Sequence, residues 1–338
     1  MERLEISKRN RILSQQRRAN KEITKGIETQ IDSFHQLNPW KRLTEYLFFI
    51  ALYVLGAVIA YFSNQSGVVL VIAIILMGIA LNSLPILIHE GLHGLLAKNE
   101  HLNHFISFLT GLPILISSTA YQTTHNNHHY ELGRKPDFGT YKQHFKNNMF
   151  VWVAYMLQLT IGSILYILFI PFIAFPTASN KSRYFIILES TLIWILFVCM
   201  LIFVPVKMIL IYWFFPLLIL NILTNLRGIA SHALGDVENI YLSSRTIFCS
   251  KIMSIIFLNE NYHLEHHLFP RIPSYNLPKT HKLIWDRLPQ ALYSKSYLDF
   301  LKMLFKSLRA NNIEPTGIVH PNKMKPKYAH SKKLGDKL

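Results

Sequence analysis

The sequence predicts an all-α integral membrane protein, and its composition and charge distribution carry that prediction. Of the 338 residues, 51% are hydrophobic and only 16% are charged, whereas about 25% of a typical soluble domain is charged. Long apolar runs fill the middle of the chain, and the basic residues behind the net charge of +16 crowd toward its two ends. This distribution favours anionic lipid headgroups over nucleic acid as a partner. The high hydrophobic fraction and the low charged fraction argue against a disordered chain and a disulfide-stapled secreted module.

The N-terminal part of the chain predicts a basic segment followed by a helical hairpin. Residues 1–40 are polar and basic and lack the apolar core of a signal peptide, so we expect a cytoplasmic segment, either an amphipathic helix or a tail. Apolar runs at 46–62 and 68–88 follow, separated by a short polar stretch. At 1.5 Å per residue, each run can cross a hydrocarbon core of about 30 Å. The two runs predict a first transmembrane hairpin.

The next two apolar segments are expected to lie in or along the membrane surface. Residues 106–120 form a short run that contains Gly111 and Pro113, which predicts an interfacial or re-entrant segment. Residues 150–175 are long enough to span. Lysine and arginine residues flank this run on both sides, which indicates that both of its ends are cytoplasmic.

The remaining apolar runs, 185–204 and 208–226, predict a second hairpin, which brings the total to about four spans. The polar and basic stretches on either side set the expected domain boundaries. A membrane domain of residues 41–290 is expected to lie between the N-terminal segment of residues 1–40 and a basic cytoplasmic tail of residues 291–338.

Histidine is the most informative residue type in the chain. Eight of the sixteen histidines form three clusters, His-Glu-Gly-Leu-His at 89–93, His-Asn-Asn-His-His at 125–129 and His-Leu-Glu-His-His at 263–267, and a ninth, His232, ends the last apolar run. A spacing of four residues places both rings of the first cluster on one helical face. Two His-x-x-His-His patterns would arise by accident in about one such sequence in a thousand. Polar residues at a membrane border are costly and usually functional, so the clusters predict a metal site.

The number of histidines indicates two metal ions. Neutral imidazoles suit iron, zinc, copper or nickel, and two cysteines, Cys199 and Cys249, cannot build a cysteine site. One zinc ion takes about four ligands, so nine imidazoles fit two ions with open positions. A pair of iron ions can activate dioxygen and attack an unactivated C–H bond, which side chains alone cannot do. A membrane setting supplies a matching substrate, such as an acyl chain.

Readings from other functional classes stay open. The first cluster is also a His-Glu-x-x-His pattern, in which His89 and His93 would bind zinc and Glu90 would act as the general base of an intramembrane metalloprotease. That reading leaves most of the clustered histidines unexplained. A metal transporter or a haem-binding membrane protein is a further alternative, although transport predicts polar residues within the spans, which are nearly free of them.

Taken together, these motifs resemble the membrane fatty acid desaturase superfamily, the histidine-box di-iron enzymes. The resemblance extends from about His89 to His281. The stretch at 261–278 and the Arg-Gly-Ile-Ala-Ser-His segment at 227–232 are similar to bacterial-type fatty acid desaturases. Carotenoid hydroxylases and ketolases share the boxes, and residues 129–138 are similar to that branch, so a carotenoid substrate is the alternative.

The resemblance implies a multi-pass protein in which four spanning helices lie below a cytosolic helical cap and hold two iron ions. The implied metal ligands are His89, His93, His125, His128, His129, His232, His263, His266 and His267. Ligand histidines usually donate their second ring N–H to a carboxylate, a carbonyl or water. Candidates for orienting the rings, or for pairing with such an acid, are Glu90, Asp137, Arg227, Asp236 and Glu265, with Glu238 as a further acid.

The implied reaction is the dioxygen-dependent insertion of a double bond into a fatty acyl chain, a step of lipid metabolism. Two electrons per turnover must come from another protein, because the sequence contains no dinucleotide-binding fingerprint, cysteine cluster or cytochrome b5 haem motif. A separate ferredoxin, or cytochrome b5 with its reductase, is therefore implied. A basic surface would suit an acidic carrier of this kind.

Overall fold

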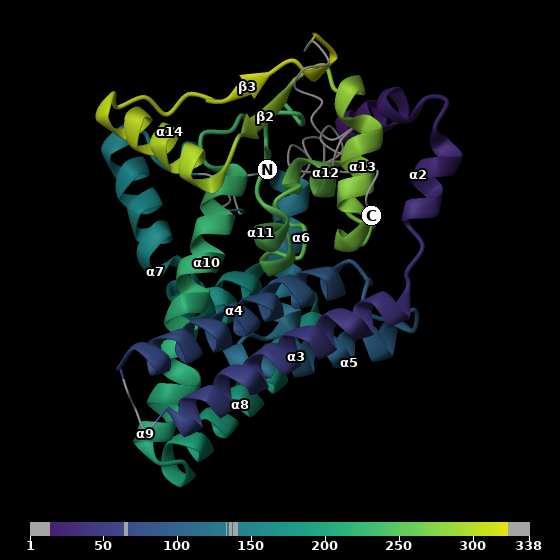
Figure 1. The fold of residues 1–338 in the computed structure, drawn as a ribbon. Coiled ribbons are helices and arrows are strands. Elements are labelled where there is room, and N and C mark those ends of the chain that lie inside the picture. The colour runs from purple at the N-terminus through teal and green to yellow at the C-terminus, as the bar shows by residue number, and fades with distance from the viewer. Residues whose placement is uncertain (1–13, 64–66, 133, 135–136, 138–140, 324–338) are drawn as a thin grey trace.

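The computed structural model of the protein describes residues 14–63, 67–132, 134, 137 and 141–323. Long helices gather at one end of the molecule, and short helices and a small sheet form the other end (Figure 1). Within the described residues, five helices are long and apolar enough to cross a membrane. The predicted all-α membrane fold is therefore confirmed, with one small sheet added.

The first predicted hairpin consists of α3 (Pro39–Phe62) and α4 (Gly67–Leu92). The Asn38 side chain caps α3 by accepting from the backbone N–H groups of the first turn, a position where asparagine is strongly preferred. The two helices cross closely at Gly56, where a Cβ atom would lie 2.7 Å from Met77 Cγ. The second half of α4 is buried, so the histidine cluster at its end lies inside the protein.

The short apolar run after this hairpin is bent. Helix α5 (Glu100–Gly111) continues into η1 (Leu112–Ile114), and α6 (Ser118–Glu131) then leaves at 103° to it. Gly111 allows the bend, because a Cβ atom there would lie 2.2 Å from the carbonyl oxygen of Ile116. The segment is thus interrupted where the glycine and proline predicted it, and α6 carries the second histidine cluster.

Helix α7 (Asn148–Ala174) is continuous and is followed by η2 (Phe175–Thr177). Its length and composition alone would allow it to span a membrane. At one end the Asn148 side chain donates to the carbonyl of Asn311, and at the other the Thr177 hydroxyl accepts from Asn127 of α6. Neighbouring segments therefore contact both ends of α7, and the four-span topology stays a prediction.

The second predicted hairpin consists of α8 (Asn180–Phe203) and a long broken helix. The broken helix is made of α9 (Val206–Ile209), the π-helical η3 (Leu210–Phe214) and α10 (Phe215–His232). It packs closely on α4, since a Cβ atom at Gly78 would lie 2.4 Å from Ile219 Cβ. This packing brings the end of α10 toward the end of α4.

The remaining elements form a group at the other end of the molecule (Figure 1). Its helical elements are α11 (Lys251–Ile256), α12 (His263–Leu268), η4 (Ser274–Asn276), α13 (Leu277–Ile284), η5 (Trp285–Arg287), α14 (Tyr297–Arg309) and η6 (Pro321–Lys323). In the sheet, β2 (Ala291–Ser294) lies parallel to β1 (Arg245–Ile247) and antiparallel to β3 (Ile318–Val319). Arg245 is fully buried and donates to the carbonyls of Thr316 and Ala233. It therefore ties the sheet to the residue that follows α10.

The described residues of both terminal segments pack on the rest of the protein. Residues 14–24 are helical and precede α2 (Glu28–Phe34), and the Ile23 side chain is buried in the same hydrophobic cluster as that of Leu268. The predicted boundary at residue 291 falls at the start of β2, which pairs with β1 of the preceding part, so this division stays a prediction. The outer parts of both segments, 1–13 and 324–338, lie outside the described residues.

Candidate metal centre

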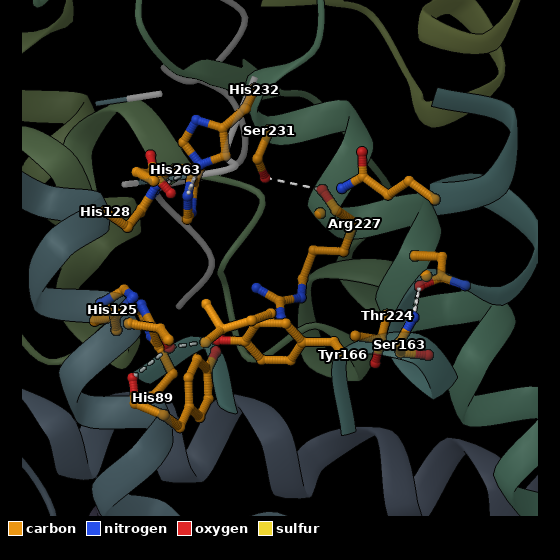
Figure 2. Close-up of a pocket in the computed structure, with 18 of the residues that line it drawn as sticks. His89, His125, His128, Ser163, Tyr166, Thr224, Arg227, Ser231, His232 and His263 are labelled. Atoms are coloured by element: carbon orange, nitrogen blue, oxygen red, sulfur yellow. Dashed lines mark hydrogen bonds and ion pairs between the residues drawn. The ribbon is translucent and has the colours of Figure 1, made fainter. Parts of the chain in front are cut away.

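The structure brings all nine predicted histidines together in two groups. Within each group, the candidate ligand atoms all lie within 4.8 Å of one another. The first group contains His89, His93, His125, His129 and His266. The second group contains His128, His232, His263 and His267. Part of both groups is seen in Figure 2.

The spacing within each His-x-x-His-His box divides its rings between the groups. In α6, His125 and His129 are four residues apart and join the first group, whereas His128 joins the second. In α12 the assignment is reversed. His263 and His267, which are four residues apart, join the second group, and His266 joins the first. Positions three and four apart lie side by side on one helical face. Each of these two helices therefore contributes to both groups.

The separations between ring nitrogens fit shared metal ions. Two imidazoles bound at right angles to one metal, each about 2.1 Å from it, have nitrogens about 3 Å apart. In the first group, the Nε2–Nε2 distances are 2.8 Å for His93–His125, 3.0 Å for His125–His129 and 3.2 Å for His129–His266. In the second group, they are 3.1 Å for His128–His232, 2.9 Å for His232–His263 and 3.2 Å for His263–His267.

The polar atoms of the site also fit a metal. A neutral imidazole carries only one N–H, so converging Nε2 atoms cannot all be paired by hydrogen bonds among themselves. Nε2 of His89 is buried without a hydrogen-bond partner among the described residues, which is unfavourable unless another group binds it. Burial lowers the pKa of His263, His266 and His267 well below the usual range. The rings are thus neutral, the form that binds metal.

Three of the second group's rings are oriented through their other nitrogen. The Nδ1 atom of His128 lies 2.8 Å from an Asp137 carboxylate oxygen, and that of His232 lies 3.1 Å from the carbonyl oxygen of Ser243. His263 Nδ1 lies 3.2 Å from Glu260. Contacts of this kind fix the tautomer and direct Nε2 toward a metal.

Glu260 is the functional residue that the sequence reasoning missed. It is fully buried, and it also lies 3.5 Å from His89 Nδ1 and 3.8 Å from Arg227 Nη1. Burial raises its pKa to about 8, and the nearby Arg227 opposes that shift. Glu260 therefore contacts a ring of each group. No local pattern indicated it, because Glu260 lies in the turn that precedes α12.

The other predicted acids have different partners. Glu90 pairs with the buried Arg42 of α3 and accepts from the backbone N–H of Ser274 at 3.0 Å. Glu265 accepts from the Thr246 hydroxyl at 2.8 Å, and it lies 2.5 Å from Nδ1 of His281.

The predicted acids of the loop after α10 make surface or backbone contacts. Asp236 accepts from the backbone N–H of Glu238, and its own N–H donates to the carbonyl of Leu242. The exposed Glu238 pairs with Arg134 at 2.7 Å. The structure thus gives both acids loop contacts rather than histidine contacts.

A cavity of about 330 Å³ lies beside the histidines, between α6, α7 and α10. Figure 2 shows His128, His232 and His263 on one side of it and Ser163 and Thr224 on another, with the Arg227 side chain between them. Most of the accessible lining is apolar. A small apolar cavity with a few polar groups is the usual form of a ligand site.

A comparison with protein families identifies the family of this chain. The sequence model of the fatty acid desaturase family matches residues 66–298, more than half of the chain. The chain belongs to the fatty acid desaturase family. No curated protein matches the chain.

Membership confirms the superfamily that the histidine boxes predicted, and it makes this desaturase-family chain an oxidoreductase. Together with its apolar helices, it also makes the chain a multi-pass membrane protein. The match begins near the start of α4 and ends inside α14, so all nine histidines lie within it. Arg42, which pairs with Glu90, lies outside the match.

Proposed function

We propose that this desaturase-family protein is a membrane-bound, di-iron, dioxygen-dependent desaturase that introduces a double bond into a fatty acyl chain. The observation that carries the proposal is the joint presence of two histidine groups and an apolar cavity beside them. One group alone would suit a structural metal. Two adjacent groups beside a space for a hydrophobic molecule suit oxidation of that molecule.

The residues of the site would have separate roles in the proposed reaction. The five histidines of the first group would together hold one iron ion, and the four of the second group would hold another. The bound pair would supply dioxygen activation and the removal of two hydrogens from adjacent carbons. Asp137, Ser243 and Glu260 hold three rings in their metal-binding orientation. The apolar lining places the acyl chain and excludes water.

A zinc hydrolase is the alternative from another class. Its general base would be Glu90, which must approach a metal-bound water. Arg42 and the Ser274 N–H both hold Oε2 of Glu90, which leaves only Oε1 for that role. A zinc site would also use only about four of the nine imidazoles.

We further propose a topology of four spans, with α7 along the membrane surface and the metal centre on the cytosolic side. The contacts at both ends of α7 support this arrangement. A separate ferredoxin, or cytochrome b5 with its reductase, would supply the electrons. The exposed basic residues Lys279, Lys282 and Arg287 support docking of an acidic carrier on the cap.

The test is expression in a host whose acyl lipids and carotenoids are both profiled. We expect new double bonds in acyl chains, and their loss in His263→Ala. The matched control is His101→Ala, because His101 is exposed at the start of α5. Altered carotenoids without new acyl double bonds would transfer the assignment to a carotenoid oxidase.

Metal analysis of the purified protein separates the functional classes. About two irons per chain support the desaturase, and one zinc per chain with no iron would refute it. A His263→Ala protein that retains full turnover would refute the role of His263 as a ligand.

A further inference from the structure

An apolar groove lies between the first turns of α7 and the end of α14. It has a volume of about 640 Å³, and it is lined by Met149, Val153 and Leu157 of α7 and by Leu308 of α14. Its described lining residues all differ from those of the cavity beside the histidines. The groove is therefore a feature of its own, and a molecule bound there need not take part in the proposed reaction.

The α7 side of the groove is both exposed and apolar. Met149 is 58% exposed and Val153 is 48% exposed, and the helix to which they belong is apolar enough to cross a membrane. On a membrane protein such a surface contacts acyl chains, because contact with water would be unfavourable. The groove therefore suits a lipid chain.

The outer face of α14 combines apolar and basic side chains. Leu298 is 62% exposed and Phe305 is also exposed, and the basic residues Lys302, Lys306 and Arg309 are exposed on the same helix. The opposite face of α14 is buried in the protein. A helix that exposes apolar residues among lysine and arginine is typical of one that lies at a membrane surface.

The basic residues of α14 are not neutralised by the acids that flank them. Residues 300–309 include three basic residues and no acidic one. Asp299 accepts from the backbone N–H of Lys295 at 3.0 Å, and Glu314 pairs with Lys142 at 2.8 Å. The end of α14 therefore carries a positive charge that can attract an anion.

This positive charge lies next to the groove. Lys306 and Arg309 belong to the last turn of α14, and Leu308 of the same turn lines the groove. The Asn148 side chain donates to the carbonyl of Asn311 at 3.0 Å, so the end of α14 is held at the start of α7 (Figure 1). A basic end beside an apolar groove is complementary to a molecule that joins a negatively charged phosphate to acyl chains.

We propose that an anionic phospholipid binds at the α14 site, which consists of the groove and the side chains of Lys306 and Arg309. An acyl chain occupies the groove, and the phosphate pairs with the two basic side chains. An acidic protein would use these charges, but it would leave the apolar groove and the exposed Leu298 and Phe305 unexplained. The family match ends at residue 298, so nearly all of α14 lies outside it. The inference goes beyond the proposed reaction and does not depend on it.

A matched pair of charge reversals tests the basic part of the site. Lys306→Glu with Arg309→Glu reverses the charge at the end of α14. The control is Lys279→Glu with Lys282→Glu, because these two residues of α13 are also basic, exposed and three positions apart.

A matched pair of tryptophan variants tests the groove. Val153→Trp fills part of the groove. Val58→Trp is its control, because Val58 is 47% exposed on α3 and does not line the groove.

The first readout is lipid retention, which does not depend on turnover. The full chain is purified in detergent and mixed with equal amounts of phosphatidylglycerol and phosphatidylcholine that have the same acyl chains, and native mass spectrometry counts the lipids that stay bound. We expect preferential retention of phosphatidylglycerol, a fall of at least fivefold in Lys306→Glu with Arg309→Glu and in Val153→Trp, and no change in either control. Equal retention of the two lipids by the unmodified protein, or an equal fall in a variant and its control, would overturn the proposal.

The second readout is thermal unfolding, which also shows whether each variant is folded. Phosphatidylglycerol should raise the thermal midpoint of the unmodified protein and of both controls, but not that of Lys306→Glu with Arg309→Glu. Inorganic phosphate and glycerophosphoglycerol, the same headgroup without acyl chains, should not raise it. An equal rise with either soluble anion would assign the charges to that anion and overturn the lipid site. An acidic ferredoxin whose binding is lost in the charge-reversed variant, with lipid retention unchanged, would assign this face to a protein and also overturn it.

Discussion

Nδ1 of His128 lies 2.8 Å from an Asp137 carboxylate oxygen, while Nε2 of the same ring faces the Nε2 atoms of His232 and His267. One nitrogen is therefore held by an acid and the other is directed into the second histidine group. A carboxylate in this position fixes the tautomer of the ring and its orientation.

Asp137→Asn should weaken metal binding by about 10- to 100-fold, the usual effect of losing such a partner. The measurement is a titration of the metal-free protein with ferrous iron, with circular dichroism as the check on folding. Asp236→Asn is the matched control, because Asp236 contacts loop backbone. Equal weakening in both variants would contradict an orienting role for Asp137.

Metal removal should destabilise the protein. Binding to the folded state alone adds about 2.7 kcal/mol per site when free iron is a hundred times its dissociation constant, and chelation also leaves buried imidazole nitrogens without a partner. We expect the thermal midpoint to fall after chelation and to recover with ferrous iron. The fall in thermal midpoint on chelation should be unchanged in His101→Ala and smaller in His267→Ala. A thermal midpoint that does not change on chelation would argue against a metal centre.

The buried carboxylate of Glu189 anchors the helix that carries the second box. It belongs to α8, and it accepts from the backbone N–H of Thr119 at 3.0 Å and from the Ser117 hydroxyl at 2.7 Å. Hydrogen bonds to charged groups contribute about 1.5–3 kcal/mol, so Glu189→Gln should lower the free energy of unfolding by a similar amount and reduce iron content. Thermal unfolding tests this. Glu238→Gln, at an exposed acid, should leave both quantities unchanged.

The N-terminal helix holds the third box from outside the family match. Gln16 donates to the carbonyl of His267, and Asn20 donates to the carbonyl of Leu268, both at 2.7 Å. These are carbonyls at the end of α12, which otherwise lack helical partners. The double variant Gln16→Ala with Asn20→Ala should lose about 1 kcal/mol per bond.

Hydrogen exchange measures this effect locally. The peptide that contains α12 should exchange faster in the double variant, and the iron content should fall. Gln30→Ala, at an exposed position of α2, should change neither. Unaltered exchange in α12 would show that the N-terminal helix does not hold the box.

Local sequence patterns predicted much of the fold and the histidine cluster. The hairpins follow from apolar runs of membrane length, and the resemblance to the desaturase superfamily implied the nine histidines that the structure brings together. The bend at Gly111 was predictable because glycine and proline interrupt helices. These features depend on neighbours within a few residues.

The rest depends on contacts between distant parts of the chain. Glu260 became recognisable only when folding placed its carboxylate beside His89 and His263. Strands of two to four residues, such as β3, carry too little alternation to be seen in a sequence. The contact between Gln16 and His267 joins residues that are 251 positions apart, so no local pattern could indicate it.

The division of the rings of α6 and α12 between the two groups has a consequence for assembly. Neither helix can shift without disturbing rings of both groups, so the two groups gain or lose their geometry as one unit. A partly loaded protein would hold its vacant site nearly preformed, and binding of the first ion would favour the second. For the same reason, displacement of a single histidine box would disrupt both groups.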